Sequence, residues 1–189
     1  GERMSARQWL LGLCAGYRQG TQRLSACHFL HECLGHGSGQ LLPGVDPDAL
    51  KAHGSTIEEA RADLFGLYYL PDAKMRELGL TPHDDAYKAE YYSFMMNGLM
   101  TQLVRIELGN NVEEAHMRNR QLIAKWVFEK GADDKVVELV KKEGKTFVKI
   151  NDYEKLRDLF GQLLGEIQRI KSEGDYEAAR QLVENYAVQ

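Results

Sequence analysis

The chain has 189 residues, of which 43% are hydrophobic and 28% charged, and its net charge is −4. That composition is typical of a globular protein and excludes a disordered or fibrous chain. Lysine and arginine are dispersed along an acidic chain, whereas a nucleic-acid binder needs a basic stripe, so we expect no nucleic-acid partner. We expect residues 1–189 to form a single, mostly helical domain.

Three cysteines, an odd number in a chain of this size, predict reduced thiols and a cytoplasmic protein. Cys27 and His28 beside His31 could imitate a structural Cys/His zinc cluster, but no C-x-x-C pair supports one. Because no apolar run approaches the roughly 20 residues that span a bilayer, we expect no membrane partner.

Helical patterns begin near the N-terminus. Trp9 to Gly35 predicts one or two helices, and the stretch GHGSGQLLPGVDP, with four glycines and two prolines, predicts a loop. The next helix is predicted to begin at Ser55, because Glu58 follows three residues later at the capping-box spacing. Pro71 then ends this helix.

The remaining elements continue the helical pattern with one exception. KVVELVKKEGKTFVKIN alternates valine with polar residues around a glycine, which predicts a β-hairpin at about residues 135–150. Helices are predicted at Asp72–Leu78, about Asp84–Leu108, about Val112–Lys130, Tyr153–Lys171 and Tyr176–Ala187. The sequence therefore predicts a mainly α fold: a helical, bundle-like lobe with one small β-hairpin.

The segment HECLGH, residues 31–36, carries two histidines five positions apart. In the zinc-protease pattern H-E-x-x-H they lie four apart and share one helix face. Five positions correspond to about 140° around a helix, so His31 and His36 would point apart in an ideal helix. A π-type turn absorbs one extra residue and is frequent at functional sites. Gly35 tolerates such a distortion, so we predict a π-turn that brings both imidazoles to one metal.

This H-E-x-x-G-H form, followed by GSG, resembles the signature of the dipeptidyl-peptidase III family of zinc exopeptidases. EEARAD (Glu58 to Asp63) resembles the family's second motif, which supplies the third zinc ligand. AHMRNR (Ala115 to Arg120) resembles a segment whose histidine faces the substrate, and KSEGDYEAARQLVENYA is also similar to the family. The resemblance extends from about Leu30 to the end of the chain.

The resemblance implies a metal centre and a base. His31, His36 and Glu59 would hold one Zn²⁺ per chain and leave the fourth position to water, as in catalytic zinc sites. Glu32 would be the general base that takes a proton from that water as it attacks a peptide carbonyl. Cobalt or copper would also accept nitrogen and carboxylate ligands.

Four further residues have family roles and alternative interpretations. The resemblance implies that Glu58 and Asp63 accept the free N–H groups of the ligand histidines. Family members often have glutamate where this chain has Asp63, and the capping box of Ser55 is an equally good interpretation of Glu58. The resemblance implies that His116 donates a hydrogen bond to the developing oxyanion and that Arg120 binds substrate. Without the resemblance, these two residues would form a solvated polar face.

Three functions remain open. The favoured one is a zinc metallopeptidase that releases dipeptides from the N-termini of short peptides. The alternatives are a less selective zinc endopeptidase and a zinc-binding helical domain that is inactive in isolation. Known family members are two-lobed and much longer than 189 residues. The resemblance therefore implies that this chain is the catalytic helical lobe of a larger peptidase, that its partner is the missing second lobe, and that it cleaves dipeptidyl substrates weakly or not at all alone.

Overall fold

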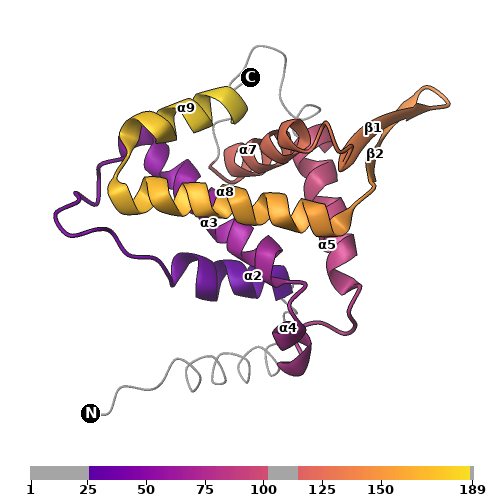
Figure 1. The fold of residues 1–189 in the computed structure, drawn as a ribbon, viewed down its shortest axis with the longest axis horizontal. Helices are drawn as coiled ribbons and strands as arrows, with labels where there is room; N and C mark the ends of the chain where they lie inside the picture. Colours follow the sequence, from indigo (N-terminus) through magenta and orange to yellow (C-terminus); the bar gives the residue numbers. More distant parts are fainter. Residues whose placement is uncertain (1–25, 102–114, 188–189) are drawn as a thin grey trace.

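The computed structural model describes residues 26–101 and 115–187, which fold into helices and one β-hairpin (Figure 1). In chain order the elements are α2 (Ala26–Leu30), the π-turn η1 (His31–His36), the 3-10 turn η2 (Lys51–His53), α3 (Gly54–Tyr69), α4 (Ala73–Glu77), α5 (Ala86–Met96), the π-turn η3 (Asn97–Thr101), α7 (Ala115–Lys130), β1 (Val137–Lys142), β2 (Lys145–Ile150), α8 (Tyr153–Glu173) and α9 (Tyr176–Tyr186). The mainly α fold predicted from the sequence is confirmed. The segments predicted at 9–25 and 102–114 lie outside the described residues.

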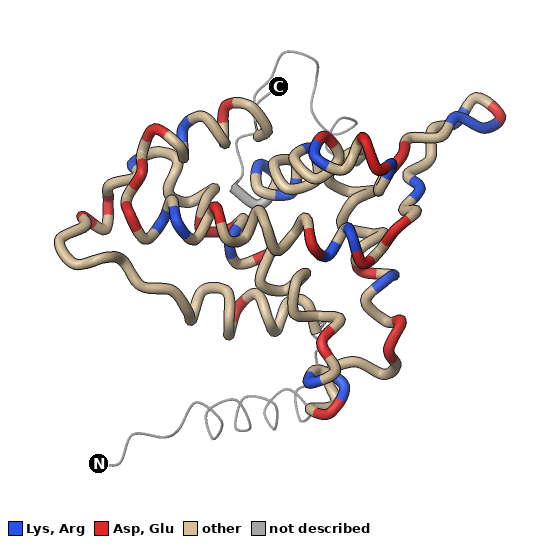
Figure 2. Tube along the Cα trace, viewed as in Figure 1, with Lys and Arg blue, Asp and Glu red and all other residues tan. Residues whose placement is uncertain are grey.

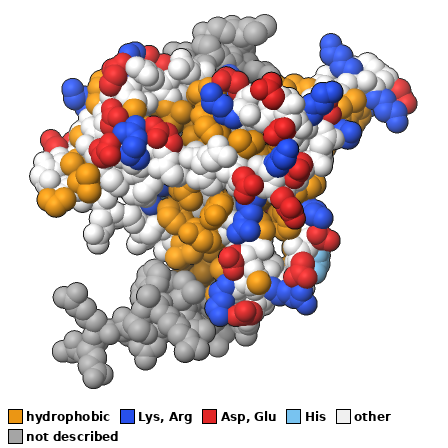
Figure 3. All heavy atoms as spheres, viewed as in Figure 1, with side chains coloured by type: hydrophobic (Ala, Val, Ile, Leu, Met, Phe, Trp, Pro, Cys, Tyr) orange, Lys and Arg blue, Asp and Glu red, His pale blue; other side chains and the backbone are white. Residues whose placement is uncertain are grey.

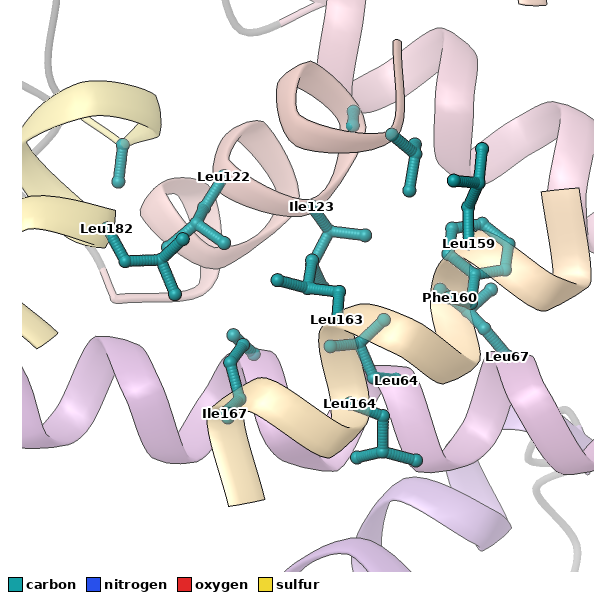
Figure 4. Close-up of a cluster of buried hydrophobic side chains, with 14 of the residues drawn as sticks. Leu64, Leu67, Leu122, Ile123, Leu159, Phe160, Leu163, Leu164, Ile167 and Leu182 are labelled. Carbon is teal, nitrogen blue, oxygen red and sulfur yellow. The ribbon is translucent and has the colours of Figure 1, made fainter. Parts of the chain in front are cut away.

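Helix α3 crosses the middle of the molecule and packs against α2, η1, α7 and α8 (Figure 1). Its core-facing residues Leu64 and Leu67 belong to one hydrophobic cluster with apolar side chains of α7, α8 and α9 (Figure 4). Those side chains include Leu122, Ile123, Leu159, Phe160, Leu163, Ile167 and Leu182. Each fully buried leucine or phenylalanine contributes about 1.5–3 kcal/mol. Helix α3 is therefore held firmly on several sides, which fixes the positions of the acids it carries.

Small residues allow α2 and η1 to lie close against α3. A Cβ on Gly35 would come within 2.6 Å of the Ala62 Cα, and a Cβ on Gly66 within 2.9 Å of the Cys27 carbonyl oxygen. Ala62 and Gly66 are one helical turn apart, so together they form a shallow face for the preceding segment. The backbone at Gly35 is not in the left-handed region. The glycine is thus required by this close contact, rather than by the backbone freedom that the sequence analysis invoked.

The predicted capping box at the start of α3 is wrong. The helix begins at Gly54, His53 occupies the N-cap position, and no side chain caps the helix there. Ser55 is therefore already inside the helix, and the Glu58 side chain is directed to other partners. Helix α8 has an ordinary cap, since the Asp152 carboxylate accepts from the backbone N–H groups of residues 154 and 155.

The hairpin pairs β1 with β2 in antiparallel register, with Val137 opposite Ile150 and Val140 opposite Phe147. Its turn uses Glu143 and Gly144, both at positive φ, 53° and 75°, which is the backbone that two-residue hairpin turns require. The hairpin extends away from the helical body (Figure 1). It therefore contributes to the core mainly through its base, where Val137 and Val148 are buried.

Charges of both signs alternate along the helices, as Figure 2 shows for the Cα trace. On the face drawn in Figure 3, acidic and basic side chains are intermingled over α8, α9 and the hairpin. None of the described helices combines the length and apolar character that crossing a membrane would need.

Candidate metal centre

The π-turn η1 places the two histidines of HECLGH side by side. The Nε2 atoms of His31 and His36 lie 3.1 Å apart, and the two rings are nearly perpendicular, with an interplanar angle of 82°. The π-turn predicted from the five-residue spacing is therefore present over His31–His36. The extra residue is absorbed in the turn, so it does not separate the imidazoles.

A carboxylate from α3 faces both histidines. The Glu59 oxygens lie 3.4 Å from the Nε2 of His31 and 3.7 Å from the Nε2 of His36. Ligands bound at 2.0–2.2 Å in a tetrahedron are separated by about 3.4 Å. The observed separations are close to this value, although different Glu59 oxygens make them, Oε2 to His31 and Oε1 to His36, so the carboxylate is near enough to join the two imidazoles around one ion.

Glu32, the residue after the first histidine, lies at the edge of this cluster. One of its oxygens is 4.0 Å from the Nε2 of His31, and its side chain is 53% exposed. Potential ligand atoms of His31, Glu32 and His36 all lie within 4.8 Å of one another. Among the described residues, this is the one group of three or more His, Cys, Asp or Glu side chains close enough to hold a metal ion. Cys27 and His28 are not part of it. Glu32 lies farther from the Nε2 of His31 than Glu59 does, at 4.0 Å against 3.4 Å.

Two more acids hold the opposite ring nitrogens. The Nδ1 of His31 is 2.7 Å from Asp63 Oδ1, and the Nδ1 of His36 is 3.0 Å from Glu58 Oε1. An ionised carboxylate only accepts hydrogen bonds, so each Nδ1 must carry the proton. Both Nε2 lone pairs are then directed at the same point, where they repel each other unless a cation lies between them. This arrangement fits a bound metal ion.

The local charges favour a cation. Burial by itself lowers the pKa of His31, but the hydrogen bond to Asp63 and the charges of Asp63, Glu59 and Glu32 outweigh it, and the pKa is raised. Burial likewise raises the pKa of Glu58, yet hydrogen bonds from Arg61, Lys171 and His36 lower it to about 2. Glu58 therefore remains ionised, and able to hold the His36 imidazole, throughout the neutral pH range.

Arg61 was missed by sequence reasoning, although it lies within EEARAD. Its guanidinium is completely buried. It donates to the Gly35 carbonyl oxygen at 2.6 Å and to the two Glu58 oxygens at 3.0 and 3.1 Å. Lys171 of α8 also contacts Glu58. Arg61 and Lys171 together hold Glu58, the acid that contacts His36, and Arg61 also holds the end of the π-turn. The sequence signal that could have identified Arg61 is a charged residue within a helix expected to be buried.

Asn119 of α7 is the second residue that the sequence analysis missed. It is completely buried, and its amide Nδ2 lies 2.6 Å from Asp63 Oδ2. The segment AHMRNR that contains it was noted for His116 and Arg120 instead. His116 lies in the first turn of α7, and its side chain is outside the described part of the structure. Arg120 is exposed.

A cleft of about 530 Å³ opens beside His31 and Glu32. Its walls come from α2, η1, α3, α5, η3 and α7, and they include His31, Glu32, Glu90, Asn97 and Arg120. This volume is within the range of small-ligand sites, about 300–1,000 Å³. Arg120, predicted to bind substrate, therefore lines the same cleft as Glu32.

The helical fold and the histidine–glutamate cluster define a helical domain with a candidate metal centre. The chain belongs to peptidase family M49, whose model matches residues 46–188. The matched span contains Glu58, Glu59 and Asp63 but begins after His36, so the position of the two histidines rests on the geometry described above.

Two solved structures are similar to this chain. A dipeptidyl-peptidase III from Caldithrix abyssi matches 86% of it at 28% identity, with a TM-score of 0.65. A dipeptidyl-peptidase III from Corallococcus sp. strain EGB matches 95% of it at 23% identity, also with a TM-score of 0.65. This second match shows that the two chains share a fold. The resemblance stated from the motifs is thus confirmed. The chain spans only 29% and 32% of the length of these two proteins.

Proposed function

We propose that this chain is the zinc-binding catalytic lobe of a two-lobed metallopeptidase that releases dipeptides from the N-termini of short peptides. The observation that carries the proposal is the pair of Nε2 atoms 3.1 Å apart, each on an imidazole whose Nδ1 contacts a carboxylate. Glu59 would complete the protein ligand set. One zinc ion per chain fits these donors, with a fourth position open to water.

Zinc bound there supplies Lewis-acid chemistry, because it polarises a peptide carbonyl and makes water acidic near neutral pH. The chain's own side chains transfer the protons and orient the two imidazoles. Glu32, exposed at the edge of the cluster, takes a proton from water and returns it to the amine of the leaving peptide. Asp63 and Glu58 hold the imidazoles by their Nδ1 atoms and so keep both Nε2 atoms directed at the metal.

The cleft beside the cluster is where we place the peptide. Arg120 on its wall would bind the substrate, and His116 would donate a hydrogen bond to the developing oxyanion. Recognition of a free α-amino group two residues from the cleaved bond would come from the second lobe. The chain spans under a third of the similar proteins, so we expect it to bind zinc while cleaving dipeptidyl substrates weakly or not at all by itself.

The first experiment is a metal analysis of the purified chain, which should find about one zinc. Glu32→Gln should retain the metal and remove hydrolysis when the lobe is placed in its complete protein, whereas Glu59→Ala should weaken metal retention. Loss of zinc from Glu32→Gln would make Glu32 a ligand and contradict these roles. A metal-free wild-type chain after exposure to zinc would contradict the proposal itself.

One alternative is a less selective zinc endopeptidase that would use the same cluster of His31, His36 and Glu59. Comparing an N-acetylated peptide with its free-amine form on the complete protein separates the two: a dipeptidyl peptidase should require the free amine. Equal rates on both peptides would favour the endopeptidase. A complete protein that binds zinc and hydrolyses neither peptide would favour the non-catalytic zinc-binding domain.

A further inference from the structure

The carboxylate of Asp63 is held from two sides. Its Oδ1 lies 2.7 Å from the Nδ1 of His31, and its Oδ2 lies 2.6 Å from the Nδ2 of Asn119. The Asp63 side chain is 15% exposed and that of His31 8%, while Asn119 is 0% exposed. Two short hydrogen bonds, largely shielded from water, therefore connect α7 through α3 to the first histidine of the π-turn.

The orientation of the Asn119 amide is fixed by its own helix. Its Oδ1 accepts a hydrogen bond from the backbone N–H of Arg120 at 2.7 Å. With the oxygen engaged on the backbone, the NH₂ group is directed at Asp63. Asn119 thus donates to the acid and cannot present its carbonyl oxygen there, which would repel the carboxylate.

We propose that Asn119 is a positioning residue for zinc binding: it holds Asp63 so that the carboxylate orients the imidazole of His31. An aspartate carboxylate can rotate about its terminal torsion. Anchoring Oδ2 to a buried amide removes that freedom and keeps Oδ1 on the Nδ1 of His31. This inference rests on the proposed zinc site, and it assigns to α7 a part in forming that site.

Removing the amide should weaken metal binding without unfolding the protein. Outer partners of metal-ligating histidines typically change affinity by about 10–100-fold when lost. We therefore expect Asn119→Ala to raise the zinc dissociation constant of the chain by about 10–100-fold. Asn119→Leu, which keeps most of the volume, should show the same loss and separates the hydrogen bond from a cavity effect.

The measurement is competition with a chromogenic zinc chelator, on chains whose circular dichroism is that of the wild type. Cobalt-substituted samples at saturating metal provide a second readout, because the d–d absorption band reports the ligand geometry directly. The matched control is Gln121→Ala. Gln121 is also buried on α7, and its amide makes no hydrogen bond to any of the described residues, so its loss should leave zinc affinity and the cobalt spectrum unchanged.

A wild-type chain that binds zinc, with both Asn119 variants within twofold of its affinity and spectrum, would overturn this inference and leave the zinc site intact. An equal loss in Gln121→Ala would also overturn it, since the effect would then come from general packing of α7. A wild-type chain that binds no zinc would overturn the proposed function first and this inference with it.

Discussion

Gly35 of the π-turn and Ala62 of α3 touch so closely that a methyl group on the glycine would lie 2.6 Å from the Ala62 Cα. The backbones of η1 and α3 must separate to admit it. This contact is what places the two histidines of the turn over the acids of the helix. The distance between these two backbones therefore affects both the stability of the fold and the geometry of the candidate metal centre.

The first prediction follows from this contact. Gly35→Ala should lower the free energy of unfolding by about 1–3 kcal/mol, because it overpacks a tight helix contact, and should weaken zinc binding. Gly165→Ala is the matched control: a Cβ at this helical position of α8 meets no atom within 4 Å. It should stabilise the chain by about 0.5–1 kcal/mol. Urea unfolding measures the free energy of unfolding of both variants. An unchanged value in Gly35→Ala would contradict the close contact between Gly35 and Ala62.

The second prediction concerns the buried guanidinium of Arg61. Arg61→Lys keeps the charge but cannot reach the Gly35 carbonyl and both Glu58 oxygens with one planar group. We expect the free energy of unfolding to fall by about 1.5–3 kcal/mol, since the Gly35 carbonyl loses its short hydrogen bond from a charged group and keeps the longer contacts with Ser38. Arg180→Lys, at a surface pair with Glu177, should leave the unfolding midpoint nearly unchanged. An unchanged free energy of unfolding in Arg61→Lys would mean that Lys171 and His36 are sufficient to hold Glu58.

The third prediction concerns metal and stability together. A ligand that binds only the folded state stabilises it by about 2.7 kcal/mol at a hundredfold excess over its dissociation constant. Zinc should therefore raise the melting temperature of the chain by roughly 5–10 °C, and a chelator should reverse the shift. Glu59→Gln should show a much smaller shift. Differential scanning calorimetry with and without zinc measures this shift. An unchanged melting temperature in the wild type would contradict the prediction.

The fourth prediction concerns the Cys27 thiol at the α2–α3 interface, whose sulfur lies 3.0 Å from where a Cβ on Gly66 would be. Burial, reinforced by the negative charges of Asp63 and Glu90, raises its pKa to about 12. Only the thiolate reacts with alkylating reagents, so at pH 8 Cys27 should react about a thousandfold more slowly than an ordinary thiol. Iodoacetamide labelling followed by peptide mass spectrometry measures this rate, and the unfolded chain provides the reference.

The same shift has a consequence for stability. The folded chain keeps the Cys27 proton more tightly than the unfolded chain. The contribution of this proton to the free energy of unfolding is therefore fully present below a pH of about 9. It should decrease as the pH rises from there towards 12. Cys27→Ser should remove this part of the pH dependence between those values. An unfolding free energy that falls equally steeply in Cys27→Ser would assign the alkaline loss to other groups.

The sequence by itself determined the features that depend on neighbouring residues. The five-residue spacing of His31 and His36 requires a π-turn if the imidazoles are to meet, and the structure has one there. The apolar spacing of residues 153–171 and the valine alternation around Gly144 likewise predicted α8 and the hairpin. These signals are readable because the angle between side chains in a helix or strand follows from their separation along the chain.

Only the tertiary structure decided which partners the charged and polar side chains have. Sequence spacing left Glu58 equally suited to capping α3 and to holding a histidine, and the packing of η1 on α3 placed it beside His36, Arg61 and Lys171. The burial of Arg61 and Asn119 has the same origin. Lys171 and Asn119 reach the site from other helices, 113 and 56 residues along the chain from the acids they contact. No local period encodes such contacts, because they depend on how closely whole helices pack.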